Sequence, residues 1–139
     1  MTTATSLTLH LAQAIGLYMI VAGLSGLAAP QRWQAIVDDL ARSAGLQMVM
    51  GVTVFAIGAA LAIAHSILVD PLAIIVTVAG WLALLEGALL IATPGPLIRI
   101  GQASLRFTRI WAFASIALGL FLALAGLTGR ADAAQSVFV

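Results

Sequence analysis

Apolar residues along this chain fall into four long runs that are separated by short polar segments. The runs extend over about Leu9 to Ala29, Leu46 to Ala64, Leu72 to Ala92 and Ile110 to Leu127. Each run is close to the roughly 20 residues that an α-helix needs to cross a hydrocarbon layer about 30 Å thick. The pattern therefore predicts four transmembrane helices.

Two of the polar segments have the periodicity of short amphipathic helices. After Pro30, the apolar residues Trp33, Ile36, Val37 and Leu40 recur at the spacing of one helical face. After Pro94, the polar and basic residues Arg99, Gln102, Arg106 and Arg109 share a face instead. We expect two interfacial helices that lie at the membrane surface, since proline suits a first helical turn and tryptophan favours the headgroup level.

The side chains expected to contact lipid headgroups are Arg32, Trp33, Arg99, Arg106 and Arg109. Each cation near an anionic membrane surface contributes about 1 kcal/mol to binding. The alternative is that these arginines serve topology alone.

The amino-acid composition excludes a soluble protein. Hydrophobic residues make up 63% of the chain, charged residues 8%, and the mean hydropathy is +1.15. A water-soluble domain of 139 residues could not cover that much apolar surface. We therefore expect one all-α membrane domain over residues 1–139, built as a four-transmembrane-helix bundle.

Arginines are concentrated in two of the loops between the runs. Arg32 and Arg42 follow the first run, Arg99, Arg106 and Arg109 follow the third, and only Arg130 lies on the other side. Such residues accumulate in short cytoplasmic loops. We expect a multi-pass protein of the bacterial cytoplasmic (inner) membrane with both termini on the periplasmic side. The net charge of +1 gives no indication of nucleic-acid binding.

The two halves of the chain share several residues at an offset of 64 positions. Gly16, Gly23, Ala28, Pro30, Ile36 and Arg42 recur as Gly80, Gly87, Ala92, Pro94, Ile100 and Arg106. We interpret this as a duplicated helical hairpin, with repeat 1 over about residues 9–66, repeat 2 over about 71–128, and a short C-terminal tail, 129–139. Two units in the same orientation form a parallel repeat. Chance matching is the alternative in a chain so rich in glycine and alanine.

The sequence "PQRW" at residues 30–33, and the Glu86-Gly87 pair that precedes Pro94, resemble the small YjeT-like two-span inner-membrane proteins of bacteria. In that family a span carries Glu-Gly and is followed by a proline and an arginine-tryptophan pair. The resemblance covers roughly residues 14 to 127 and implies two such units in tandem. Ala22 stands where the first glutamate would be, and Leu97 stands where the second tryptophan would be. The family is uncharacterised, so the resemblance implies a fold and no reaction.

Glu86 is the only acidic residue inside a predicted span. A carboxylate there costs about 2.5 to 3.5 kcal/mol on insertion scales, so it is expected to face protein or water and to have a partner. It lies about 12 Å from the cytoplasmic end of its span, at 1.5 Å per residue. Ser25, Thr53 and Ser115 lie at similar depth and complete the expected intramembrane polar site. This site is either a hydrogen-bonded contact between helices or a site that binds protons or cations.

The two histidines, His10 and His65, lie at the outer ends of neighbouring spans. Paired imidazoles could ligate haem or a metal, but no Cys, Glu or third His joins them, and we favour ordinary interfacial histidines. Tyr18 and Trp81 lie near mid-membrane. Aromatic rings at that depth could line a groove for a quinone, a carotenoid or a lipid tail, but packing is the preferred interpretation, and no cofactor is expected.

The sequence contains no recognisable catalytic constellation, since it lacks a phosphate-binding loop, zinc-ligand spacing and a nucleophile with a base. Small residues recur at four-residue spacing on several spans and allow close helix packing. We expect a non-enzymatic accessory or assembly subunit that packs against the transmembrane helices of a larger complex, or against itself, within membrane lipid. Two alternatives stay open: a small proton-coupled transporter or channel-like oligomer using Glu86, and a protein that binds lipid, quinone or pigment.

Overall fold

The computed structural model describes residues 3–66 and 68–128, which are helical apart from short connections. The elements are α1 (Thr3–Ala28), α2 (Pro30–Arg42), α3 (Ala44–Ala64), α4 (Pro71–Ala92), α5 (Pro94–Ser104), the 3-10 turn η1 (Leu105–Phe107) and α6 (Thr108–Thr128). Four helical segments are long and apolar enough to cross a membrane. The prediction of an all-α chain with four such helices is confirmed, while the predicted tail and Arg130 lie outside the described residues.

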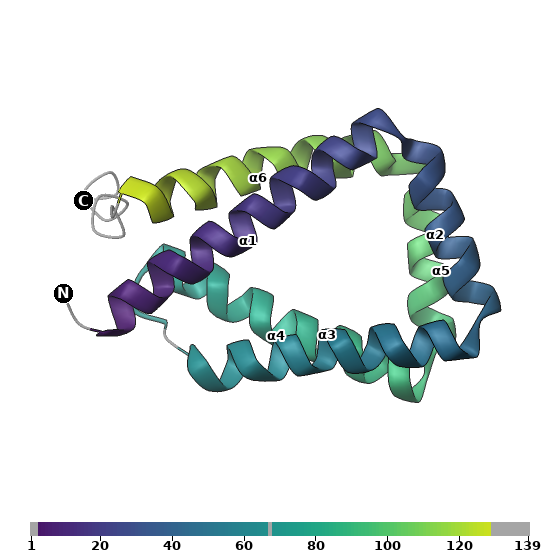
Figure 1. Cartoon of the computed structure of the whole chain (residues 1–139), viewed down its shortest axis with the longest axis horizontal. Helices are drawn as coiled ribbons and strands as arrows, with labels where there is room; N and C mark the ends of the chain where they lie inside the picture. Colours follow the sequence, from purple (N-terminus) through teal and green to yellow (C-terminus); the bar gives the residue numbers. More distant parts are fainter. Residues whose placement is uncertain (1–2, 67, 129–139) are drawn as a thin grey trace.

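The long helices form two antiparallel pairs, α1 with α6 and α3 with α4 (Figure 1). The shorter helices α2 and α5 lie side by side across one end of the molecule and connect the pairs (Figure 1). At the opposite end α1 approaches α4, whereas toward α2 and α5 the pairs move apart (Figure 1). The described chain therefore has the outline of a wedge whose broad end is closed by α2 and α5.

Glycines in α3 and α4 bring the two backbones into direct contact. A Cβ atom built on Gly58 would lie 2.2 Å from the backbone nitrogen of Leu84, and one built on Gly87 would lie 2.3 Å from that of Phe55. No side chain fits at such distances. Small residues at helix contacts in membranes allow this close approach, which is stabilised by van der Waals packing.

The two pairs have glycines at corresponding positions but differ in register. Gly16 on α1 lies against Gly119 and Ala123 of α6. At an offset of 64, its counterpart Gly80 would meet positions 55 and 59 of α3, but it lies against Leu61. The offset of 64 therefore reproduces the pairing of the helices, but it does not reproduce the register of their contacts.

A small apolar core joins the pairs at the narrow end of the wedge. Leu9 and Ala12 of α1, Leu72 and Val76 of α4, and Leu122 of α6 are buried against one another. Elsewhere many large apolar side chains are exposed. A soluble protein rarely exposes so continuous an apolar surface, but lipid covers it in a membrane.

Asp70 is the N-cap of α4, where its carboxylate accepts a hydrogen bond from the Ala73 backbone N–H at 2.8 Å. We expect Asp70→Ala to lower the free energy of unfolding by about 1 kcal/mol, because the first turn loses its acceptor. Asp70→Asn keeps an acceptor oxygen and is expected to lose much less. Reversible unfolding in mixed micelles measures both, with the exposed Asp39→Ala as control. Equal losses for the two Asp70 variants would contradict a capping role.

Candidate functional site

Glu86 is exposed on α4 in the isolated chain. It forms neither a hydrogen bond nor an ion pair with any residue that the structure describes. The carboxylate therefore does not point into a contact between helices of this chain, as the sequence analysis expected. Any partner of Glu86 comes from another molecule or from outside the described segments.

The hydroxyl groups expected near Glu86 are engaged elsewhere or lie apart from it. Ser115 donates a hydrogen bond to the Met19 carbonyl at 2.8 Å, across the contact between α6 and α1. Thr53 donates to the Val49 carbonyl of its own helix at 2.7 Å. Ser25 is half-buried on α1. The four residues thus lie on four different helices, and the three hydroxyl groups do not gather around the carboxylate.

Glu86 lies on the face of α4 that is directed toward α1 and α6. On this face Leu72 and Ile75 pack into the core at the narrow end of the wedge. Glu86 follows Ile75 by eleven residues, which is about three turns at 3.6 residues per turn. Toward the carboxyl end of α4 the two pairs move apart (Figure 1). Glu86 lies in the last two turns of this helix and is exposed. Ala79 and Ala83 are its half-buried neighbours on this face.

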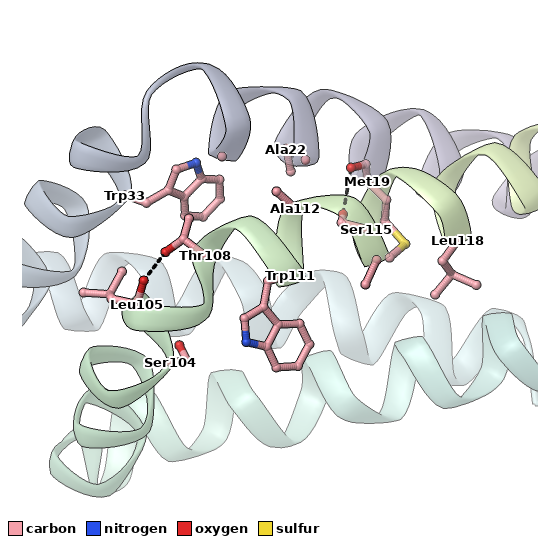
Figure 2. Close-up of a pocket in the computed structure, with 13 residues that line it drawn as sticks. Met19, Ala22, Trp33, Ser104, Leu105, Thr108, Trp111, Ala112, Ser115 and Leu118 are labelled. Carbon is pink, nitrogen blue, oxygen red and sulfur yellow. Dashed lines mark hydrogen bonds between the residues drawn. The ribbon is translucent and has the colours of Figure 1, made fainter.

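An apolar groove runs between α1 and α6 beside the start of α2 (Figure 2). Its volume is about 390 Å³, and Met19, Trp33, Trp111 and Leu118 are among its walls. The Trp111 side chain is 63% exposed, so the groove is open on that side. Tyr18 and Trp81, the aromatic residues that could have lined a groove according to the sequence, do not line this one.

Trp33 is the residue of the expected headgroup set that the structure places in this groove. Figure 2 shows its indole nitrogen turned toward α1. Nε1 is buried and has no hydrogen-bond partner in residues 3–66 and 68–128. The ring lies next to α1 at Gly26, where a Cβ atom would be at an ordinary contact distance of 3.8 Å from Nε1. The ring thus closes one end of the groove.

A more polar depression of about 220 Å³ adjoins the groove. Arg106 and Arg109 line it, together with Pro30 at the start of α2. Leu105 and Thr108 line both the groove and the depression, so the two lie directly side by side. The Thr108 hydroxyl donates a hydrogen bond to the Leu105 carbonyl, which holds the turn at this point (Figure 2).

The turn η1 also explains which arginines gather at the depression. The sequence pattern placed Arg99, Arg106 and Arg109 on one face of a continuous helix. In the structure α5 ends at Ser104 and η1 redirects the chain before α6. Arg99 therefore stays on α5 and lines neither cavity, and neither does the exposed Arg32 of α2.

His65 lies in a buried polar cluster that joins the helix pairs at the narrow end. Its Nε2 is 2.6 Å from the Thr8 hydroxyl of α1, and its Nδ1 is 3.0 Å from the Thr77 hydroxyl of α4. The histidine itself is only 1% exposed. Both ring nitrogens are thus in hydrogen bonds, and the one to Thr8 crosses from the α3/α4 pair to the α1/α6 pair.

His10 takes no part in this cluster. It is exposed, and its Nδ1 is 2.8 Å from the Ser6 carbonyl of its own helix. Across the described residues, no group of three or more His, Cys, Asp or Glu side chains is placed to hold a metal ion. The partners of His65 were not predicted, although Thr8 and Thr77 are polar residues within helices that are otherwise strongly apolar.

Residues 11–64 match a family model described as "Uncharacterized protein conserved in bacteria (DUF2065)". The matched segment covers most of α1 and all of α2 and α3, and it falls within the first of the two expected repeats. Neither the curated proteins nor the solved structures include a match to the chain. Four apolar helices and similarity to an uncharacterised bacterial family therefore indicate a multi-pass membrane protein without indicating an activity.

Proposed function

We propose that this chain is a non-enzymatic accessory subunit that packs against a transmembrane helix of another membrane protein. The observation that carries the proposal is the exposed position of Glu86 in the middle of an apolar helix, without a partner in the described chain. A carboxylate that faces hydrocarbon costs about 2.5 to 3.5 kcal/mol even on the lowest scales. A hydrogen-bond donor on a partner helix offsets this cost, so Glu86 favours association.

The docking face that we propose consists of Ala79, Ala83 and Glu86 on α4. The two alanines let a second backbone approach closely, and the carboxylate selects a helix with a hydroxyl, amide or cationic side chain at the same depth. A second copy of the chain is a poorer partner. A twofold axis along the membrane normal would bring two Glu86 carboxylates to the same depth, where like charges repel.

We further infer that α2 and α5 lie at the cytoplasmic surface of the bacterial inner membrane. Five arginines, Arg32, Arg42, Arg99, Arg106 and Arg109, belong to α2, α5, η1 or the start of α6, and these elements meet at one end of the molecule (Figure 1). Arginine accumulates in cytoplasmic loops, which supports periplasmic termini and interfacial positions for the two short helices.

We also infer that the chain arose as a tandem duplication of a helical hairpin. The pairing supports this, because the contact of α1 with α6 corresponds to that of α4 with α3 when the halves are exchanged. Gly16 and its counterpart Gly80 lie at these contacts. The difference in register then reflects divergence of the halves.

Photo-crosslinking in native membranes tests the accessory role. A photoreactive residue at Ala83 is expected to yield a crosslink to another membrane protein. Glu86→Leu should reduce this product about tenfold or more, since it removes the hydrogen-bonding group and 1.4 kcal/mol corresponds to tenfold. Glu86→Gln retains hydrogen bonding and should keep the product.

Trp81→Leu is the matched control, because Trp81 is 55% exposed on α4 and points away from the docking face. It should leave the crosslink unchanged. A product that persists in Glu86→Leu would contradict the proposal. A product that contains only two copies of this chain would assign the face to self-association and would contradict it as well.

A further inference from the structure

We propose that the groove between α1 and α6 and the adjoining depression bind one phospholipid with an anionic headgroup. This site lies on the α1/α6 pair and is separate from the docking face on α4. In the proposed orientation, the headgroup occupies the depression at the cytoplasmic end of the pair. One acyl chain then follows the groove toward the bilayer centre.

The depression has the charge that an anionic headgroup requires. Arg106 and Arg109 are both exposed, and both line it. Pro30 places the amino end of α2 beside them, and Ala29, the N-cap of this helix, provides no side-chain acceptor. The partial positive charge of a helix amino end adds to that of the arginines. Among the described residues, no Asp or Glu lines either cavity.

The groove has the length and polarity that an acyl chain requires. Its walls run along α6 from Thr108, beside Arg109, to Leu118. Nine residues separate Arg109 from Leu118, which is about 13 Å at 1.5 Å per residue. One leaflet of a hydrocarbon core about 30 Å thick has a depth of about 15 Å. The groove therefore spans most of one leaflet, starting from the level of the arginines.

Charge and polarity together distinguish a phospholipid from a helix of a partner protein. Arg106 and Arg109 line the depression, while among the described residues no Arg, Asp or Glu lines the apolar groove. A phospholipid has the matching arrangement, with one anionic group at the end of an apolar chain.

Native mass spectrometry from lipid nanodiscs tests the proposal. We use nanodiscs of phosphatidylcholine alone and nanodiscs that also contain phosphatidylglycerol, and we measure the lipid that stays bound after release. The wild-type chain is expected to retain one phosphatidylglycerol and to prefer it over phosphatidylcholine. The double variant Arg106→Gln/Arg109→Gln should bind it about 30-fold more weakly, as two contributions of about 1 kcal/mol would give.

Two matched controls separate a defined site from a general effect of charge or bulk. Arg99→Gln removes an arginine that lines neither cavity and should leave retention unchanged. Ala114→Trp fills the groove at an exposed position of its wall and should abolish retention. Ala117→Trp adds the same bulk at an exposed position of α6 outside the groove and should have no effect.

Circular dichroism verifies that each variant is folded before its lipid is measured. The proposal is overturned if phosphatidylcholine is retained as well as phosphatidylglycerol. It is also overturned if Arg99→Gln weakens binding as much as the loss of Arg106 and Arg109, because the effect is then one of overall surface charge. If Ala114→Trp does not fold, the comparison of the arginine variants decides the question alone. A bound protein or second copy in place of lipid overturns the proposal as well.

Discussion

Gly58→Ala is expected to lower the free energy of unfolding by about 3 kcal/mol and to loosen the contact between α3 and α4. The added Cβ atom would lie 2.2 Å from the backbone nitrogen and 2.6 Å from the Cα atom of Leu84. Backbone atoms cannot rotate away as a flexible side chain can, so the two helices have to separate. Overpacking of a well-packed contact typically costs about 1 to 3 kcal/mol, and a backbone clash lies at the upper end.

Gly95→Ala is the matched control for this effect. A Cβ atom at Gly95 would have no atom within 4 Å, so only the local helix propensity changes. Reversible unfolding in mixed micelles, followed by circular dichroism, measures the free energies of both variants. The prediction is wrong if Gly58→Ala is as stable as Gly95→Ala, since the close contact between α3 and α4 would then not contribute to stability.

The four long helices are predictable from sequence because the bilayer imposes their length. Most predicted span boundaries agree with the helix ends to within a few residues. Two of them, Ala64 and Ala92, are the residues at which α3 and α4 end. The largest difference is at the start of α1, which begins at Thr3 and not near Leu9. Polar residues before Leu9 lower the hydropathy without preventing a helix. Hydropathy therefore identifies the apolar part of α1 and underestimates the length of the whole helix.

Pairing between the helices is not predictable in the same way. Hydropathy fixes how deep a residue lies, but the direction in which its side chain points depends on which backbone packs against which. Gly58 and Gly87 are recognisable as small residues, but the identity of their contacts, Leu84 and Phe55, emerges only from the assembled pair. The difference in register between the two pairs is likewise visible only in the assembled structure.

The residues of the expected polar site do not lie together, because depth was the only criterion that grouped them. Ser25, Thr53 and Ser115 were grouped with Glu86 by depth alone, and depth does not determine whether two side chains face each other. Ser115 instead satisfies its hydroxyl at the Met19 carbonyl across the α1/α6 contact. The groove was not predicted because its walls come mainly from α1 and α6, and the pairing of these helices is not visible in the sequence.

Under the proposed duplication, the two pairs carry different chemistry at equivalent positions. Ala22, a wall of the groove on α1, corresponds to Glu86 on α4 at the offset of 64. Trp33, which closes the groove, corresponds to Leu97. Under the two proposals, the α1/α6 pair provides an apolar groove for lipid, while the α3/α4 pair presents a carboxylate for a protein partner. Divergence of this kind would let one small chain link a membrane complex to the lipid around it.

His65→Ala is expected to lower the free energy of unfolding by about 3 kcal/mol and to separate the two helix pairs at the narrow end. The substitution removes the buried ring that joins Thr8 of α1 to Thr77 of α4. Each of the two lost hydrogen bonds contributes about 1 kcal/mol, and the cavity left by the buried ring adds to the cost. His10→Ala is the control, because His10 is exposed and bonds only within α1.

Electron paramagnetic resonance distances distinguish this effect from general unfolding. Spin labels at the exposed positions Leu17 and Val78 report the separation of α1 from α4, and labels at Leu17 and Leu120 report the α1/α6 pair. In His65→Ala the first distance should lengthen or broaden while the second stays unchanged, because glycine contacts hold each pair independently of the histidine. If both distances change together, His65 supports the whole fold and does not specifically join the pairs.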